Sequence, residues 1–145
     1  MSGLRTLRQL PPTERGLLLR TVLLVGAIRT ALWLVPFRRA RQFMRACKRL
    51  PLRVPEEMPV SRLVWAVHAA SRRIPMASCL TQSLALQFLL IRAGRSSQLH
   101  LGVKKDPQTG FQAHAWVEHG GCTLLSTPSE IVGYSPILAL EDLSA

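Results

Sequence analysis

The stretch "RIPMASCLTQSLALQFLLIRAG" (residues 73–94) decides the fold. Ser78 is a good N-cap, so a helix should begin at Cys79. Apolar residues then occupy almost every direction around the helix, and Gly94 is a suitable residue to follow its end. Because a helix that is apolar all round is buried, this stretch predicts a central helix with a cysteine at its first position.

A cysteine at the start of a helix is placed for nucleophilic chemistry. Unpaired N–H groups and the helix macrodipole favour the thiolate of Cys79. Gln82 and Ser83 lie three and four positions further on, so they share its face of the helix. Backbone N–H groups, with the Gln82 amide, could then hold an oxyanion. The alternative is an inert thiol that packs as a small apolar side chain.

The residue pattern changes from helical to alternating after Gly94. "QLHLGV" (98–103) and "FQAHAWVE" (111–118) alternate apolar and polar residues, and "CTLLS" (122–126) follows a turn. We expect three antiparallel strands, and then an irregular return of the chain to the body. Helices followed by a meander indicate an α+β fold.

His114 is the candidate base for Cys79. It lies in the middle of the second predicted strand, and Trp116 lies on the same strand face. A thiol and an imidazole at the end of a buried helix could act as nucleophile and general acid/base in acyl transfer. The alternatives are a histidine with a structural role, and a Trp116 that belongs to the core instead of lining a site.

The positive charge is concentrated in the first part of the chain. The 145 residues carry a net charge of +11, and residues 1–53 hold twelve basic residues against one acidic residue, Glu14. Such a surface suits a membrane face, a nucleic acid or an acidic peptide, or it is only a solvated basic face. We expect no nucleic acid, because no nucleic-acid-reading motif accompanies the charge.

The N-terminal half is predicted to be helical. A helix should start at Thr13 as N-cap and end near Val35, and residues 37–50 form a second, basic amphipathic helix. A proline-rich linker and a helix capped by Ser61 follow. We expect one compact domain, in which a basic helical segment (1–60) packs on a catalytic core (61–145).

One segment resembles a membrane span. Residues 16–37 are rich in leucine, but Arg20 and Arg29 interrupt them. Two arginines in the apolar region would offset much of the gain from insertion. We therefore expect a buried or partner-facing helix, with loose association to a membrane surface as the alternative. The absence of a secretory pattern and the three sparse cysteines favour the cytoplasm.

A metal site is not expected. Cys79, Cys122, His114 and His119 could be drawn as zinc ligands, but the chain has no close ligand pair such as C-x-x-C. We predict neither a metal nor another cofactor.

Several strings resemble a known family. They are "RRIPMASCLTQSLALQFLLIRAG" (72–94), "LHLGVKK" (99–105), "FQAHAWVEHGG" (111–121) and the leucine-rich, basic front (10–39). Together they resemble the transglutaminase-like leader peptidases of lasso-peptide biosynthesis. The resemblance covers roughly residues 10–138. It implies a transglutaminase-like core of the papain-like cysteine protease type.

The resemblance also implies an activity and partners. Members of that family remove the leader from a ribosomally synthesised precursor peptide, with Cys79 as nucleophile and His114 as base in this chain. A lasso cyclase then uses the amine that is freed. This chain has no spare region for a leader-binding domain, so a separate small leader-recognition protein is implied.

The third catalytic position departs from the family. An acidic residue about a dozen positions after the histidine should orient the imidazole and stabilise its charge. Here that place holds Ser126, which could orient the ring, and Glu130 is the alternative. A catalytically degenerate module that only binds the peptide is therefore the rival interpretation.

Overall fold

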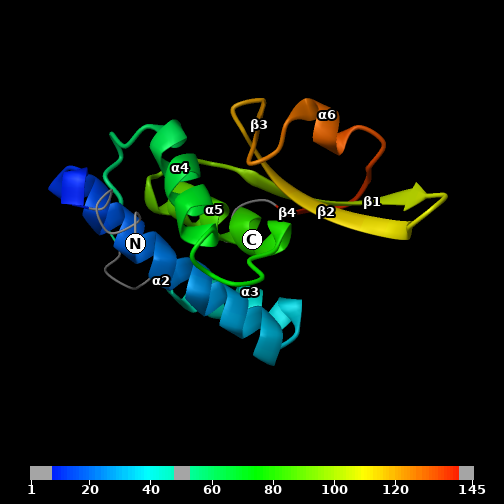
Figure 1. Cartoon of the computed structure of the whole chain (residues 1–145), viewed down its shortest axis with the longest axis horizontal. Helices are drawn as coiled ribbons and strands as arrows, with labels where there is room; N and C mark the ends of the chain where they lie inside the picture. Colours follow the sequence, from blue (N-terminus) through cyan, green and yellow to red (C-terminus); the bar gives the residue numbers. More distant parts are fainter. Residues whose placement is uncertain (1–7, 48–52, 141–145) are drawn as a thin grey trace.

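The computed structural model describes residues 8–47 and 53–140, as helices packed on a small antiparallel sheet (Figure 1). Its helices and strands, in chain order, are α2 (Pro12–Leu34), α3 (Phe37–Ala46), α4 (Val60–Ser71), α5 (Cys79–Arg92), β1 (Gln98–Asp106), β2 (Gly110–His119), β3 (Cys122–Leu124), α6 (Pro128–Ile131) and β4 (Ser135–Leu140). The predicted α+β class is confirmed.

Helix α5 is the centre of the fold, as predicted. The Ser78 hydroxyl accepts a hydrogen bond from the Thr81 N–H at 3.3 Å, which caps the helix and makes Cys79 its first residue. Gly94 follows the C-cap residue Ala93 and adopts a left-handed φ of 72°. Most residues from Thr81 to Leu90 are buried, and α2, α4 and the sheet all pack against this helix.

Prolines begin the outer helices, and this corrects two predicted caps. Pro11 occupies the N-cap position of α2 and Pro59 that of α4, so Thr13 and Ser61 lie inside the first turns. A proline suits this place because its fixed φ is close to the helical value and the N–H it lacks would be unpaired there. The second helix ends at Ala46, and residues 48–50 of its predicted range lie outside the described residues.

The basic helices lie directly on the rest of the fold. Helix α2 contacts both α4 and α5 along its buried side. The boundary predicted at residue 60 stays a prediction.

The four strands form one sheet in the order β3-β2-β1-β4, and every pair is antiparallel. The Asp106 carboxylate accepts from the N–H groups of Gln108 (2.7 Å) and Thr109 (3.0 Å), which closes the turn from β1 to β2. The backbone bonds that hold this turn also lower the pKa of Asp106. Gly120 and Gly121 form the next turn, with φ of 58° and 79°. Positive φ at both central residues is what a two-residue hairpin prefers.

The end of the chain is more regular than predicted. The third strand stops at Leu124, and the segment expected to be irregular contains the short helix α6 and the edge strand β4. Strand β4 returns to pair with β1, and the Gln87 amide of α5 donates to the Leu140 carbonyl at 3.2 Å. The prediction of an irregular return was therefore wrong.

The two faces of the sheet have different neighbours. Leu99 and Val117 are paired across β1 and β2 and belong to the core that contains α5. Strand residues alternate, so His114 and Trp116 lie on the opposite face. Figure 1 shows α6 on one side of the sheet and α2 and α3 on the other. Trp116 is nevertheless only 3% exposed.

Gly102 makes room for the Trp116 ring. A Cβ atom at residue 102 would lie 2.8 Å from two carbons of the indole and 3.2 Å from the Tyr134 Cβ. Real Cβ atoms essentially never come so close, so the indole can lie flat on β1 only because residue 102 has no side chain.

Leu90 tests the importance of the α5 core. Leu90→Ala removes a fully buried side chain and should lower the free energy of unfolding by about 2–5 kcal/mol. Leu23→Ala is the matched control, because Leu23 is 74% exposed and should change stability by no more than about 0.5 kcal/mol. Urea denaturation followed by circular dichroism measures both. Equal effects of the two variants would show that α5 is not the core.

Gly102 tests the packing of Trp116. Gly102→Ala should cost about 1–3 kcal/mol of unfolding free energy because the indole must move. In Gly102→Ala/Trp116→Phe the ring is shorter, so the cost should fall below the sum of the single changes. Near-ultraviolet circular dichroism and urea denaturation provide the measurement. Additive costs would contradict the proposed contact.

Gly16→Ala is the control for Gly102→Ala, because it adds the same methyl group where there is space for it. Gly16 lies inside α2, and a Cβ atom there would meet nothing within 4 Å. Gly16→Ala should therefore stabilise the fold by about 0.5–1 kcal/mol, since alanine is the better helix former.

Candidate active site

Cys79 sits where the sequence placed it, half-buried at the first position of α5. Within residues 8–47 and 53–140, the backbone N–H groups of Cys79 and Leu80 have no hydrogen-bond partner. The next two N–H groups are satisfied, by the Ser78 hydroxyl and the Ser78 carbonyl. Two free donors beside a thiol are what an oxyanion needs.

The polar residues next to Cys79 differ in their hydrogen bonding. The Gln82 amide donates to the Ala77 carbonyl at 3.3 Å, so it braces the turn that leads into α5. Ser83 lies one turn below Cys79 and is 1% exposed. Its hydroxyl oxygen has no partner in the described part of the chain. Of the two polar residues, Ser83 is therefore the buried one without a hydrogen-bond partner among the described residues.

His114 is hydrogen-bonded to Ser126. The imidazole Nε2 and the Ser126 Oγ are 2.8 Å apart, and both side chains are half-buried. The two residues are twelve positions apart in sequence and come from β2 and from the segment after β3. The predicted pair of base and orienting residue is thus brought together in space.

Leu125 makes that contact geometrically feasible. Leu124 pairs with Val117, so a regular continuation of β3 would direct Ser126 to the same side as Leu124, away from His114. Leu125 instead adopts a left-handed φ of 67°, which is uncommon for a leucine. The chain turns there and delivers Ser126 to the His114 face.

Aromatic rings surround the imidazole of His114. Trp116 stacks with it at a centroid distance of 6.2 Å, and Tyr134 tilts against it at 5.5 Å. Trp116 was predicted to wall the site, and it does adjoin His114. Tyr134 was not predicted, because it lies in the segment that was expected to be irregular.

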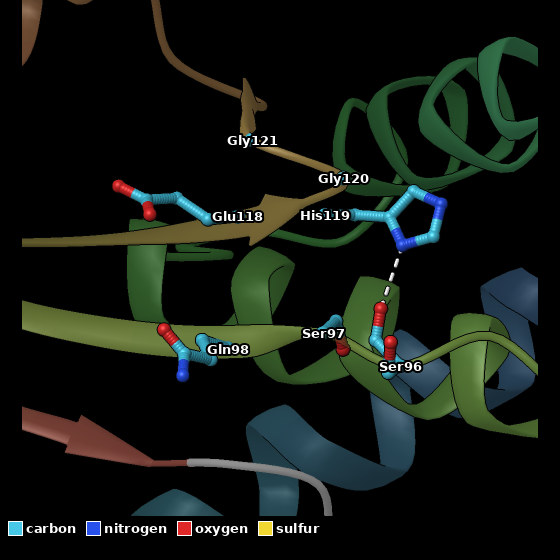
Figure 2. Close-up of a pocket in the computed structure, with 7 residues that line it drawn as sticks. All are labelled: Ser96, Ser97, Gln98, Glu118, His119, Gly120 and Gly121. Atoms are coloured by element: carbon cyan, nitrogen blue, oxygen red, sulfur yellow. Dashed lines mark hydrogen bonds between the residues drawn. The ribbon is translucent and has the colours of Figure 1, made fainter.

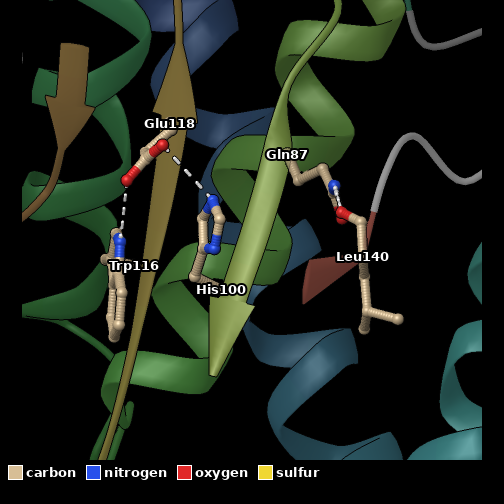
Figure 3. A network of polar contacts seen from close by, with 5 residues as sticks. All are labelled: Gln87, His100, Trp116, Glu118 and Leu140. Atoms are coloured by element: carbon tan, nitrogen blue, oxygen red, sulfur yellow. Dashed lines mark hydrogen bonds and ion pairs between the residues drawn. The ribbon is translucent and has the colours of Figure 1, made fainter. Parts of the chain in front are cut away.

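Glu118 holds Trp116 from the other side (Figure 3). Its carboxylate accepts from the Trp116 indole N–H at 3.3 Å and lies 3.4 Å from the His100 Nε2. His100 also stacks on Trp116, with centroids 5.5 Å apart. The contact between His100 Nε2 and the Glu118 carboxylate is close but is not aligned as a hydrogen bond. It is an ion pair only when the imidazole is protonated.

Glu130 has a structural partner of its own. Its carboxylate accepts from the Thr127 N–H at 2.5 Å and from the Thr127 hydroxyl at 3.0 Å, a capping box at the start of α6. These bonds, and to a smaller extent the charge of His114, lower the pKa of Glu130. Ser126, not Glu130, is bonded to the imidazole.

Cys79 stands apart from this cluster. In the described part of the chain no hydrogen bond joins its thiol to His114. Because Val117 packs in the α5 core, alternation places His114 on the other face of β2. The hydrogen bonds of catalytic groups often form fully only in the substrate complex. The structure therefore brings His114, Ser126 and Trp116 together and, within the residues it describes, shows no hydrogen-bond contact between them and the Cys79 thiol.

A polar pocket lies at the end of the sheet (Figure 2). It has a volume of about 500 Å³ and is lined by Ser96, Ser97, Gln98, Glu118, His119, Gly120 and Gly121. His119 Nδ1 lies 2.6 Å from the Ser96 carbonyl oxygen and fixes one wall. The pocket contains none of the predicted catalytic residues.

The four residues that could be drawn as zinc ligands do not form a cluster. In the described ranges no three His, Cys, Asp or Glu side chains are grouped to hold a metal ion.

Comparison with known proteins gives the family. The family model of the transglutaminase-like superfamily matches residues 22–139. No curated protein and no solved structure matches the chain significantly. The matched range runs from α2 to β4 and contains Cys79, His114 and Ser126. The chain thus belongs to the transglutaminase-like superfamily, a fold that includes cysteine peptidases.

Proposed function

We propose that the protein is a cysteine peptidase that removes the leader from a lasso-type precursor peptide. The observation that carries the proposal is the pairing of two features in a transglutaminase-like core. Cys79 begins a capped helix beside free N–H groups, and His114 is held by Ser126 at 2.8 Å. The sequence strings that resemble lasso leader peptidases supply the substrate class.

The bond to Ser126 suggests which imidazole nitrogen reacts. If Nε2 carries the proton and donates to the Ser126 Oγ, the lone pair lies on Nδ1. For Nδ1 to accept the proton of the Cys79 thiol, substrate binding must bring the two groups within hydrogen-bond distance, because no bond joins them in the described structure. The ion pair of thiolate and imidazolium that results is the reactive form of the site.

The reaction proceeds through a thioester. The thiolate attacks the carbonyl carbon of the peptide bond to be cut, and the carbonyl electron pair moves to oxygen. When the C–N bond breaks, the amine of the core peptide takes the proton from His114 Nδ1. Water then attacks the thioester, gives a proton back to His114, and releases the leader carboxylate and the Cys79 thiol.

The oxyanion would be held by the backbone. The N–H groups of Cys79 and Leu80 are unpaired in the described structure, whereas the Gln82 amide already donates to the Ala77 carbonyl. Gln82 would then shape the turn that presents these donors. Trp116 would wall the imidazole and shield its bond to Ser126 from water.

The proposal includes partners. The substrate is the precursor peptide, a separate small protein recognises the leader, and a lasso cyclase consumes the freed amine. We propose that this takes place in the cytoplasm and needs no cofactor.

A second function has its own support. A catalytically degenerate module would keep the fold and bind the peptide without cutting it. Two observations favour this alternative: the thiol of Cys79 is not bonded to His114, and a serine takes the place of the acidic residue at 126. Cleavage experiments separate the two functions.

Cys79 and His114 should both be required for cleavage. Cys79→Ala and His114→Ala should each lower the cleavage rate by at least about a hundredfold, because nucleophile or base is lost. The substrate is the precursor peptide encoded next to this protein, and the leader-recognition protein is present. Mass spectrometry measures the cleavage products. Cys122→Ala and His68→Ala are matched controls at exposed positions. If the wild type binds a labelled leader in fluorescence anisotropy but never cuts it, the binding module is the correct function.

Ser126 should tune the rate. Ser126→Ala should lower kcat/KM about threefold to tenfold, the value of one hydrogen bond to the imidazole. Ser126→Asp should raise it, because a carboxylate also stabilises the imidazolium. Ser129→Ala, on the exposed helix α6, is the matched control. A Ser126→Ala variant with unchanged kcat/KM would show that the hydroxyl does not orient His114.

A further inference from the structure

Helix α2 carries a second apolar face that the fold does not use. Its buried residues include Leu18, Val25 and Ile28. On the opposite side, the outer stripe consists of Leu19, Leu23, Ala27, Thr30 and Leu34, all exposed. Steps of four, four, three and four residues keep them on one side of the helix. At 1.5 Å per residue the stripe is about 22 Å long.

The exposure of this stripe is unusual. Leu19, Leu23 and Leu34 are 62%, 74% and 66% exposed, and the neighbouring Trp33 is 76% exposed. The outer face of a helix in a globular protein normally carries charged and polar residues. Single exposed leucines need no explanation, but an ordered row of them indicates a surface that something covers.

An apolar groove continues the stripe onto α3. The groove has a volume of about 430 Å³ and lies between α2 and α3. Leu23 and Ala27 belong to both the stripe and the groove, and Phe43, 58% exposed, forms the wall on α3. The apolar surface is therefore continuous over two helices.

The charged residues of the segment that carries this surface all have the same sign. Residues 15–47 include seven arginines and no aspartate or glutamate. Arg20 lines the groove, and Arg38, Arg39 and Arg45 are exposed on α3 outside the groove lining. An apolar surface on two helices whose charged residues from 15 to 47 are all arginines is complementary to an anionic, apolar partner.

We propose that the outer stripe, the groove and these arginines dock the protein onto the surface of an anionic lipid bilayer. The leucine-rich stripe follows the outer side of α2 from Leu19 to Leu34, which suits an extended interface better than a single peptide. Exposed tryptophan, leucine and phenylalanine next to arginine are typical of helices that lie in the headgroup region. Each arginine gains from the negative potential of the membrane surface.

The buried side of α2 determines how the helix meets the membrane. By length and composition, Pro12–Leu34 is the one helix of the described residues that could cross a bilayer. Its inner face packs on α4 and α5, so a spanning helix would have to leave the core. Docking along the outer stripe keeps those contacts and leaves the Cys79 and His114 regions folded.

Vesicle binding tests the proposal without any peptidase substrate. The full chain should sediment with vesicles of equal parts phosphatidylglycerol and phosphatidylcholine, and more weakly with phosphatidylcholine alone. Binding should weaken at roughly 0.15 M salt or above. Trp33 emission should shift to the blue and be protected from iodide, and Trp33→Phe should remove this change. The other two tryptophans, Trp65 and Trp116, are half-buried and buried.

Variants locate the surface. Leu19→Ser/Leu23→Ser/Leu34→Ser should weaken vesicle binding at least about tenfold through lost apolar burial. Arg38→Gln/Arg39→Gln/Arg45→Gln should do the same through lost charge. Phe111→Ser/Ile137→Ser is the matched control, since both residues are exposed on the sheet. Leu23→Ser alone, verified by circular dichroism, keeps the test valid if the triple variant does not fold.

Three results would overturn the proposal. The first is no sedimentation with the mixed vesicles at low salt. The second is equal sedimentation of wild type and the Leu23→Ser and arginine variants. The third is a homodimer in light scattering that the stripe variants dissociate while no vesicles are bound, which would assign the stripe to a second copy of the chain.

Discussion

The burial of α5 is the constraint on which the rest of the structure depends. Nearly every side chain from Thr81 to Leu90 is buried, because α2, α4 and one face of the sheet enclose the helix. Only the start of the helix escapes this enclosure, because α5 begins after the Ser78 cap at the half-buried Cys79. Chemistry on this helix is therefore restricted to its N-terminus, where the unpaired N–H groups are.

The far face of the sheet is organised around one indole. Trp116 lies over Gly102, its N–H is held by Glu118, and its ring stacks between His100 and His114. Ser126 completes this face after the left-handed turn at Leu125. A non-glycine residue with positive φ costs about 1–3 kcal/mol, and such strain concentrates where a side chain must be redirected. The cost at Leu125 is explained by the position that it gives Ser126.

Local patterns predicted the parts of the fold that depend on local physics. The cap at Ser78, the glycine after α5 and the β1–β2 hairpin all follow from short sequence signals, and all are present. Strand β4 was missed because almost all of its residues are exposed and its pairing with β1 is formed across the sheet. Tyr134 was missed because it precedes β4, in the segment that was expected to be irregular. The spacing of twelve residues between His114 and Ser126 allowed their contact to be predicted. Its geometry could not be predicted, because it depends on the left-handed φ of Leu125.

Helix α2 explains why its segment looks like a membrane span in sequence and yet packs in a folded core. A helix that serves only a core is apolar on one side, and a spanning helix is apolar on all sides. Here the inner side supplies Leu18, Val25 and Ile28 to the interior, while the outer side keeps its leucines exposed. Burial accounts for the first group and leaves the second without a partner inside the described chain. Because residues 15–47 carry seven arginines and no carboxylate, the apolar residues that the fold leaves exposed are those that an anionic, apolar surface would bind.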